Sequence, residues 1–185
     1  MSNDSLAVSE ALGARLISYP TVADRPSMNA MYRVRCVDPQ GAEKWDEVGK
    51  NLVVDVGAQY MLDTSFNSGT AIAGTSWYMG LKDTSAAAAT DTLASHSGWS
   101  ELTPYSGNRH LWTQGASSGT GTGNRQVTNG TAVSFTINAS ATVGGIFICS
   151  AASGTTGTLF NATSFSASRA VNSGDTLLCT YTLSI

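Results

Sequence analysis

Apolar and polar residues alternate over most of the chain. The alternation is clearest in segments 31–37, 133–138 and 177–184, where every second side chain is aliphatic, aromatic or Cys. A two-residue period is typical of strands that bury one face. Turn-forming residues flank these segments, as at 38–41 and 172–175. The pattern therefore predicts short antiparallel strands joined by turns.

Two segments are apolar in a more continuous run. Segment 77–81 reads Trp-Tyr-Met-Gly-Leu, and aromatic side chains of this kind suit the pleated surface of a half-buried strand. Segment 142–149 is richer in aliphatic residues and predicts a strand buried on both faces. Weaker patterns predict further short strands at 43–48, 108–114, 159–165 and 167–171.

One helix is predicted, over residues 54–64, and segment 51–54 is either a short strand or the lead-in to that helix. Segment 95–99 predicts a single helical turn. The residues expected on the buried face of the helix are Val56, Tyr60, Met61 and Leu62.

Short strands at this spacing predict an all-β fold, namely an antiparallel β-sandwich or jelly-roll-like domain with one short helix and an N-terminal arm. A chain of 185 residues fits one such domain with an extension. We place the domain at 31–185 and the N-terminal arm or extension at 1–30.

The first thirty or so residues differ from the rest, because Pro20 and Pro26 interrupt any helix and no strand period is visible. Three interpretations remain open. The segment is a short amphipathic helix, an extended arm that orders against a neighbouring subunit, or disordered. In the arm interpretation, the residues that contact the partner are Leu6, Leu12, Leu16 and Ile17.

Charge is scarce, and its distribution is uneven. Only 12% of residues are charged, against about a quarter in an ordinary soluble protein. From Thr113 to Ile185 the only charged side chains are Arg125, Arg169 and Asp175. A segment this neutral and rich in Ser, Thr, Gly and Asn indicates β-structure whose surface is covered by other protein.

Several classes of partner are not expected. A net charge of −3 is weak and of the wrong sign for binding nucleic acid. No signal peptide pattern is visible at the start, and no apolar run approaches the roughly 18 residues of a membrane helix. We therefore expect a protein that is made in a cytoplasm and does not enter a membrane.

The residues that usually carry chemistry are few. Cys36, Cys149 and Cys179 are far apart and lie in apolar segments, so we expect reduced, buried thiols. No spacing of Cys, His or carboxylates indicates a metal or cofactor. His96 and His110 lack the motif of a hydrolase. We predict no catalytic, cofactor-binding or metal-binding residues.

The carboxylates gather in one short region with lysines between them. This spacing indicates a solvent-exposed rim on the first hairpin rather than an acid–base pair. The residues concerned are Asp38, Glu43, Asp46 and Glu47, with Lys44 and Lys50.

Four tryptophans lie in the middle of the chain, and Trp is a common anchor of protein interfaces. Trp77 lies in an apolar segment and is expected in the core. Trp45, Trp99 and Trp112 have polar neighbours, so we predict that they lie on the surface and contact a partner.

Five motifs carry a family resemblance: Asn-Leu-Val-Val-Asp-Val-Gly at 51–57, Trp-Tyr-Met-Gly-Leu at 77–81, Asp-Thr-Leu-Ala-Ser-His-Ser-Gly-Trp at 91–99, Gly-Thr-Thr-Gly-Thr-Leu at 154–159 and Ser-Gly-Asp-Thr-Leu at 173–177. In this order they resemble a group of small virion structural proteins of tailed bacteriophages, known as head decoration, cement or fibre proteins. The resemblance covers roughly residues 50–185. The group has no agreed catalytic or ligand residues to carry over.

The resemblance implies a structural protein and not an enzyme. We expect a capsid decoration or cement protein, made in the host bacterial cytoplasm and located in the virion. Its partner would be the major capsid protein or another virion protein, and it would itself form a trimer or dimer.

Two other functions remain open. One is a head or tail fibre or adaptor that contacts the host surface or a glycan, as the tryptophans and the Gly, Ser and Thr loops suggest. The other is a glycan hydrolase, which needs two carboxylates about 5–10 Å apart across a cleft. The sequence offers no candidate pair for it.

Overall fold

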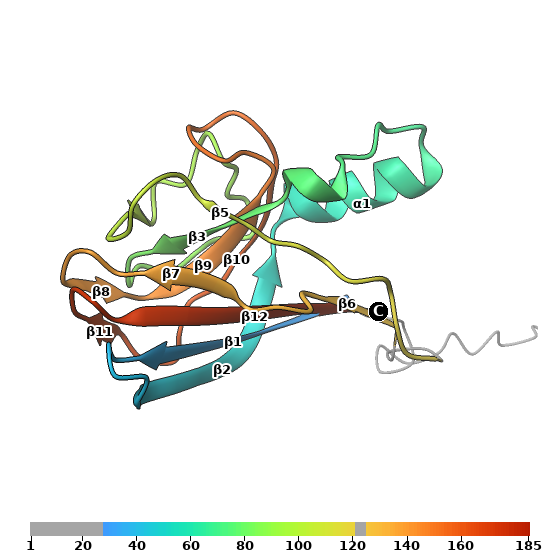
Figure 1. Ribbon diagram of the computed structural model, residues 1–185. Helices are drawn as coiled ribbons and strands as arrows, with labels where there is room; N and C mark the ends of the chain where they lie inside the picture. The colour runs from blue at the N-terminus through green and yellow to red at the C-terminus, as the bar shows by residue number, and fades with distance from the viewer. Residues whose placement is uncertain (1–27, 121–124) are drawn as a thin grey trace, which may run out of the picture.

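Figure 1 shows the computed structural model of the protein, which describes residues 28–120 and 125–185. These residues form twelve strands, one α-helix and one short 3₁₀ helix. The helices are α1 (Asp55–Phe66) and η2 (Gly74–Ser76). The strands are β1 (Asn29–Val37), β2 (Glu43–Val53), β3 (Tyr78–Lys82), β4 (Glu101–Leu102), β5 (His110–Leu111), β6 (Gln126–Thr128), β7 (Val133–Thr136), β8 (Ala141–Val143), β9 (Gly145–Cys149), β10 (Leu159–Ala162), β11 (Arg169–Val171) and β12 (Thr176–Ser184).

Ten of these strands form one antiparallel sheet in the order β4-β3-β9-β10-β2-β1-β12-β6, and β5 and β7 pair with β3 and β12 respectively. β8 and β11 form a separate pair. The long sheet curls into a half-barrel (Figure 1), and the two side strands, β5 and β7, contact each other. An isolated bridge between Tyr105 and Ile137 also links segments that are distant in sequence. The all-β, sandwich-like prediction is confirmed, with the core between the two halves of one curled sheet.

The first hairpin follows directly from the alternating pattern. Every second residue of β1 is buried, beginning at Ala30 and ending at Cys36. Between β1 and β2, the Asp38 carboxylate accepts hydrogen bonds from the backbone N–H groups of Gln40 (2.9 Å) and Ala42 (2.8 Å). β1 then pairs with β12 along its whole length, which places the described start of the chain beside its end.

Strand β9 is buried on both faces, as predicted. Ile146 and Ile148 face the main core inside the half-barrel. Phe147 and Cys149 face the opposite way, into a second core that also contains Leu93. The loop between β3 and β4 therefore covers the outer face of the sheet at this point.

Several element boundaries differ from the sequence prediction. The apolar segment 142–149 is broken at Gly144, since β8 pairs with β11 while β9 pairs with β3. The segment 108–114 yields only the short strand β5, and α1 continues two residues beyond the predicted end, to Phe66. Segment 95–99 contains turns instead of a helical turn.

Helix α1 projects from the sheet toward the right of Figure 1, and it contacts β10 through a glycine. Gly57 is the buried residue of α1, and a Cβ atom at this position would overlap the backbone carbonyl of Phe160. The helix also begins in close contact with the sheet, because the Val54 N–H donates to the Phe160 carbonyl at 3.2 Å. The absence of a side chain at Gly57 thus sets how closely α1 approaches the sheet.

Replacing Gly57 with alanine should lower the free energy of unfolding by about 1–3 kcal/mol, because the helix must move away from β10. In an exposed helix the same change raises stability by roughly 1 kcal/mol, so the sign separates close packing from helix propensity. Urea denaturation measures the effect. Ser65→Ala, at an exposed position of α1, is the matched control and should change stability little. A gain in stability for Gly57→Ala would contradict the packing argument.

Candidate functional site

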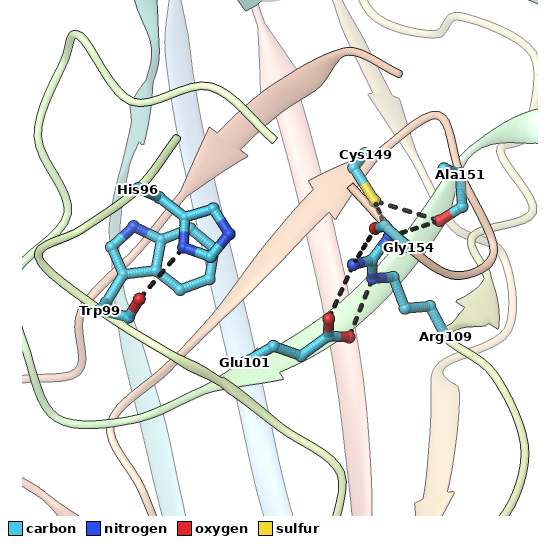
Figure 2. A network of polar contacts seen from close by, with 7 residues as sticks. All are labelled: His96, Trp99, Glu101, Arg109, Cys149, Ala151 and Gly154. Carbon is cyan, nitrogen blue, oxygen red and sulfur yellow. Dashed lines mark hydrogen bonds and ion pairs between the residues drawn. The ribbon is translucent and has the colours of Figure 1, made fainter. Parts of the chain in front are cut away.

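The most connected polar group in the described residues is the guanidinium of Arg109 (Figure 2). Its Nε and Nη2 atoms donate to the two carboxylate oxygens of Glu101 at 2.8 and 2.7 Å. Nη1 donates to the Ala151 carbonyl at 2.9 Å, and Nη2 donates to the Gly154 carbonyl at 2.8 Å. Nη1 also lies 3.5 Å from the Cys149 sulfur.

This network holds loops together. Arginine has five N–H donors, and all five have partners in these contacts. The Arg109 side chain is only 4% exposed, and its guanidinium lies over the Phe147 ring at 5.2 Å. It joins the loop before β5 to the loop after β9, so that no donor remains for a substrate anion.

His96 lies near this network, stacked on Trp99 (Figure 2). The two ring centroids are 4.0 Å apart, and the His96 Nδ1 lies 3.1 Å from the Trp99 backbone carbonyl. The indole Nε1 of Trp99 donates to the Asp91 carboxylate at 2.8 Å. These contacts fix the loop that covers β9.

Lys82 is a second buried cation, which the sequence analysis missed. Lys82 is 0% exposed. Its ammonium group donates hydrogen bonds to the carbonyls of Asp83 (3.0 Å) and Ser85 (2.5 Å) and to the Ser164 hydroxyl (3.3 Å). Burial lowers the pKa of Lys82. With its three donors occupied, the ammonium connects β3 to the loops around it.

The predicted solvent-exposed rim of the first hairpin is wrong for Glu47, whose side chain is 2% exposed. Its Oε2 accepts from the Nε and Nη2 of Arg169, and its Oε1 accepts from the Ser166 N–H at 2.7 Å. The Tyr32 hydroxyl lies 3.4 Å from the same Oε1. The carboxylate is buried because strand β2 turns this side of the hairpin toward the loop that precedes β11.

A second ion pair joins the same two parts of the chain. Lys44 pairs with Asp175, whose side chain is 2% exposed. Two of the three charged residues of the neutral C-terminal half, Arg169 and Asp175, are thus paired with the first hairpin. Arg125, the third, has no ion-pair partner among the described residues.

The three thiols are free and buried, as predicted. Burial, followed by the nearby Asp175 carboxylate, raises the pKa of Cys36 to about 11. Burial also raises the pKa of Cys149 and of Cys179. Since the thiolate is the reactive form, these residues act as core packing and not as nucleophiles.

An almost wholly apolar groove lies between α1 and the curled sheet, with a volume of about 340 Å³. Tyr60 of α1, Trp77 and Phe160 form a row of edge-on aromatic contacts along it, with ring centroids 5.3 and 5.6 Å apart. Met61, Val127 and Leu183 also line it, and the same three residues line a smaller adjoining space of about 130 Å³ that reaches Ile185. We call these two spaces together the α1 groove.

The outer face of α1 carries two exposed apolar side chains, Leu62 (61% exposed) and Phe66 (86% exposed). The prediction that Leu62 faces the core is wrong. At about 100° per residue, Leu62 and Phe66 lie roughly 140° and 180° around the helix from Gly57, which contacts the sheet. In the sequence, Gly57 indicates which side of the helix faces the sheet, because a glycine inside a helix often marks a close approach to another element.

The three tryptophans predicted on the surface differ in exposure. Trp45 is partly exposed, and its Nε1 donates to the Ala170 carbonyl at 3.2 Å. Trp99 and Trp112 are only 4% and 5% exposed, so their predicted place on the surface is wrong. Trp99 packs in the second core against Phe147, and Trp112 packs on Tyr181. Their polar sequence neighbours belong to loops that fold over the sheet.

The other predicted partner-binding residues, Leu6, Leu12, Leu16 and Ile17, lie outside the described residues. Their docking on a partner stays a prediction. Among the predicted contact residues that the structure describes, Trp112 belongs to the main core, Trp45 packs against that core, and Trp99 belongs to the second core. The structure adds the α1 groove and the exposed pair on α1.

No family model matches the chain, and no curated protein matches it. Within 28–120 and 125–185, no cluster of three or more His, Cys, Asp or Glu residues is suited to holding a metal ion. In the same part of the chain, no helix has the length and apolar character needed to span a membrane.

Proposed function

We propose that this chain is a structural protein of a bacteriophage particle, which decorates the capsid and holds neighbouring capsid subunits together. The resemblance carried by the motifs described above supports this class of protein. The observation that supports a contact role is the pair Leu62 and Phe66, exposed on a helix that projects from the sheet. Contiguous exposed apolar surface is a mark of interaction sites.

The mechanism is mechanical. A specific contact buries on the order of 1,000 Å², and many equal contacts on a repeated lattice add through avidity. The area buried across a junction between capsid subunits raises the free energy needed to open the shell. In this proposal the partner is the major capsid protein, and the chain acts as a dimer or trimer within the virion after synthesis in the bacterial cytoplasm.

The low charge of the C-terminal half suits this task. Its exposed strand positions carry residues such as Ser134, Thr136 and Thr142. Hydroxyl groups form hydrogen bonds with a partner without the desolvation penalty of ions, which is several kcal/mol per buried charge. Contacts of this type also depend little on salt.

Quantitative mass spectrometry of purified particles tests the proposal. We expect hundreds of copies in each particle. A few to a few dozen copies would assign the chain to a fibre or adaptor instead, and absence from the particle would end the proposal.

A variant identifies the contact surface. Leu62→Ser with Phe66→Ser should bind heads that lack the chain at least about tenfold more weakly, because two apolar anchors are lost. Val48→Ser, which changes an exposed apolar residue of β2 (55% exposed), is the matched control. Equal binding of the double variant and the unchanged chain would exclude α1 as the contact.

A further inference from the structure

The described chain begins beside the α1 groove. Asn29, the first residue of β1, pairs with Ser184 of β12. The two neighbours of Ser184 in sequence, Leu183 and Ile185, both line the smaller part of the groove, and Leu183 lines the larger part as well. Residues 1–27 therefore join the domain within a few residues of an open apolar surface.

The groove requires an apolar occupant. Its larger part contains no charged side chain, and Arg125 is the one charged residue lining the smaller part. Aromatic rings and aliphatic side chains supply most of its surface, so that a charged segment would lose its hydration there without gaining partners. Residues 12–17 of the chain present Leu12, Leu16 and Ile17 within six positions, and Arg15 is the one charged residue among the six.

The length of the connection permits docking within one chain. Eleven residues lie between Ile17 and Asn29. The twelve steps from one Cα atom to the next, at roughly 3.3 Å each, extend to about 40 Å. A segment tethered this close to its site has an effective concentration in the millimolar range. Docking to the same chain is therefore favoured over docking to a second chain in dilute solution.

We propose that residues 1–27 occupy the α1 groove of their own chain, with Leu12, Leu16 and Ile17 as the apolar contacts. The segment covers the partly exposed side chains of Met61, Val127 and Leu183, which line both parts of the groove, before the protein meets any partner. This inference goes beyond the proposed function and is independent of it, because it concerns the purified chain alone.

Photo-crosslinking of the full-length chain tests the inference. A diazirine-bearing lysine analogue replaces Gln126, an exposed residue that lines the smaller part of the groove, and in a control it replaces Thr142, an exposed residue of β8. Equal amounts of ¹⁴N-labelled and ¹⁵N-labelled protein are mixed before irradiation. Mass spectrometry then identifies the crosslinked peptides and shows whether one or two chains supplied them.

We expect crosslinks from position 126 to residues within 1–27, in peptides of a single isotope, and none from position 142. Leu16→Asp with Ile17→Asp should reduce them at least about tenfold, whereas Ser18→Asp, which adds charge without removing an apolar contact, should not. Circular dichroism verifies that each variant keeps its fold.

Two results would overturn the inference. Crosslinks of mixed isotope would show that a neighbouring copy supplies the segment. No crosslink from position 126 to residues 1–27 would show that this segment does not occupy the groove. Another occupant, such as an apolar small molecule, would then be indicated. The larger part of the groove, at about 340 Å³, is at the lower end of the usual range of about 300–1,000 Å³ for small-molecule sites.

Discussion

Replacing Arg109 with methionine should lower the free energy of unfolding by about 3–5 kcal/mol. The substitution leaves the Glu101 carboxylate and the Gly154 carbonyl without their donors from Arg109, whose side chain is 4% exposed. The Ala151 carbonyl keeps only the Cys149 thiol, at 3.3 Å. Each buried acceptor that loses its partner retains the full desolvation penalty. The loop before β5 and the loop after β9 should loosen together, and urea denaturation measures the total effect.

An exposed ion pair supplies the control. Arg33 pairs with Asp46 across β1 and β2, and its side chain is 56% exposed. Arg33→Met should cost much less than Arg109→Met, because water screens an exposed ion pair. The double variant Arg109→Met with Glu101→Leu should recover part of the loss, since it removes both charges. A cost below 1 kcal/mol for Arg109→Met would show that the network in Figure 2 does not stabilise the fold.

Replacing Glu47 with glutamine should lower the free energy of unfolding by about 3 kcal/mol at pH 7. The amide keeps the shape of the side chain but removes the charge that faces Arg169. One of its two polar atoms becomes a donor, so the contacts with Ser166 and Arg169 cannot both persist. Urea denaturation at pH 7 measures the loss.

The same variant tests the effect of pH. Burial raises the pKa of Glu47, but the hydrogen bonds from Arg169 and Ser166 outweigh it, and the net result is a lowered pKa. A carboxylate of this kind stabilises the fold above its ordinary pKa of about 4, and the contribution is lost as the pH falls through the lower, folded value.

The unchanged chain and Glu47→Gln should therefore differ most at pH 7. They should converge as the pH falls from about 4 through the lower, folded pKa, below which Glu47 is protonated and resembles glutamine. Denaturation curves recorded between pH 2 and 7 check this expectation. A difference that stays constant over that range would show that the charge of Glu47 contributes nothing.

The sequence predicted the strands of the described domain well wherever burial is periodic. In β1 and β12 the alternation of apolar and polar residues is local information, and it coincides with the observed burial. The burial of β9 on both faces was also visible as a continuous apolar run. Periodicity indicates that a face is buried, but it does not identify what covers that face.

The tryptophans show that limit. Trp99 and Trp112 have polar neighbours in sequence, and yet both are buried, because the loops that carry them fold over the two sides of the curled sheet. Leu62 shows the opposite error, since it fits the apolar stripe of the predicted helix and faces solvent in the structure. In both cases the deciding contact comes from a segment distant in sequence.

The amino-acid sequence by itself determined the class of fold, the turns of the first hairpin, the reduced state of the thiols and the scarcity of charge. Only the tertiary structure decided which of the few charges are buried, since Glu47 finds Arg169 across 122 positions and Lys44 finds Asp175 across 131. It also created the α1 groove, where the closeness of Gly57 to β10 fixes one wall. The physical reason is that backbone propensity and periodicity act over a few residues, whereas ion pairs and grooves depend on the path of the whole chain.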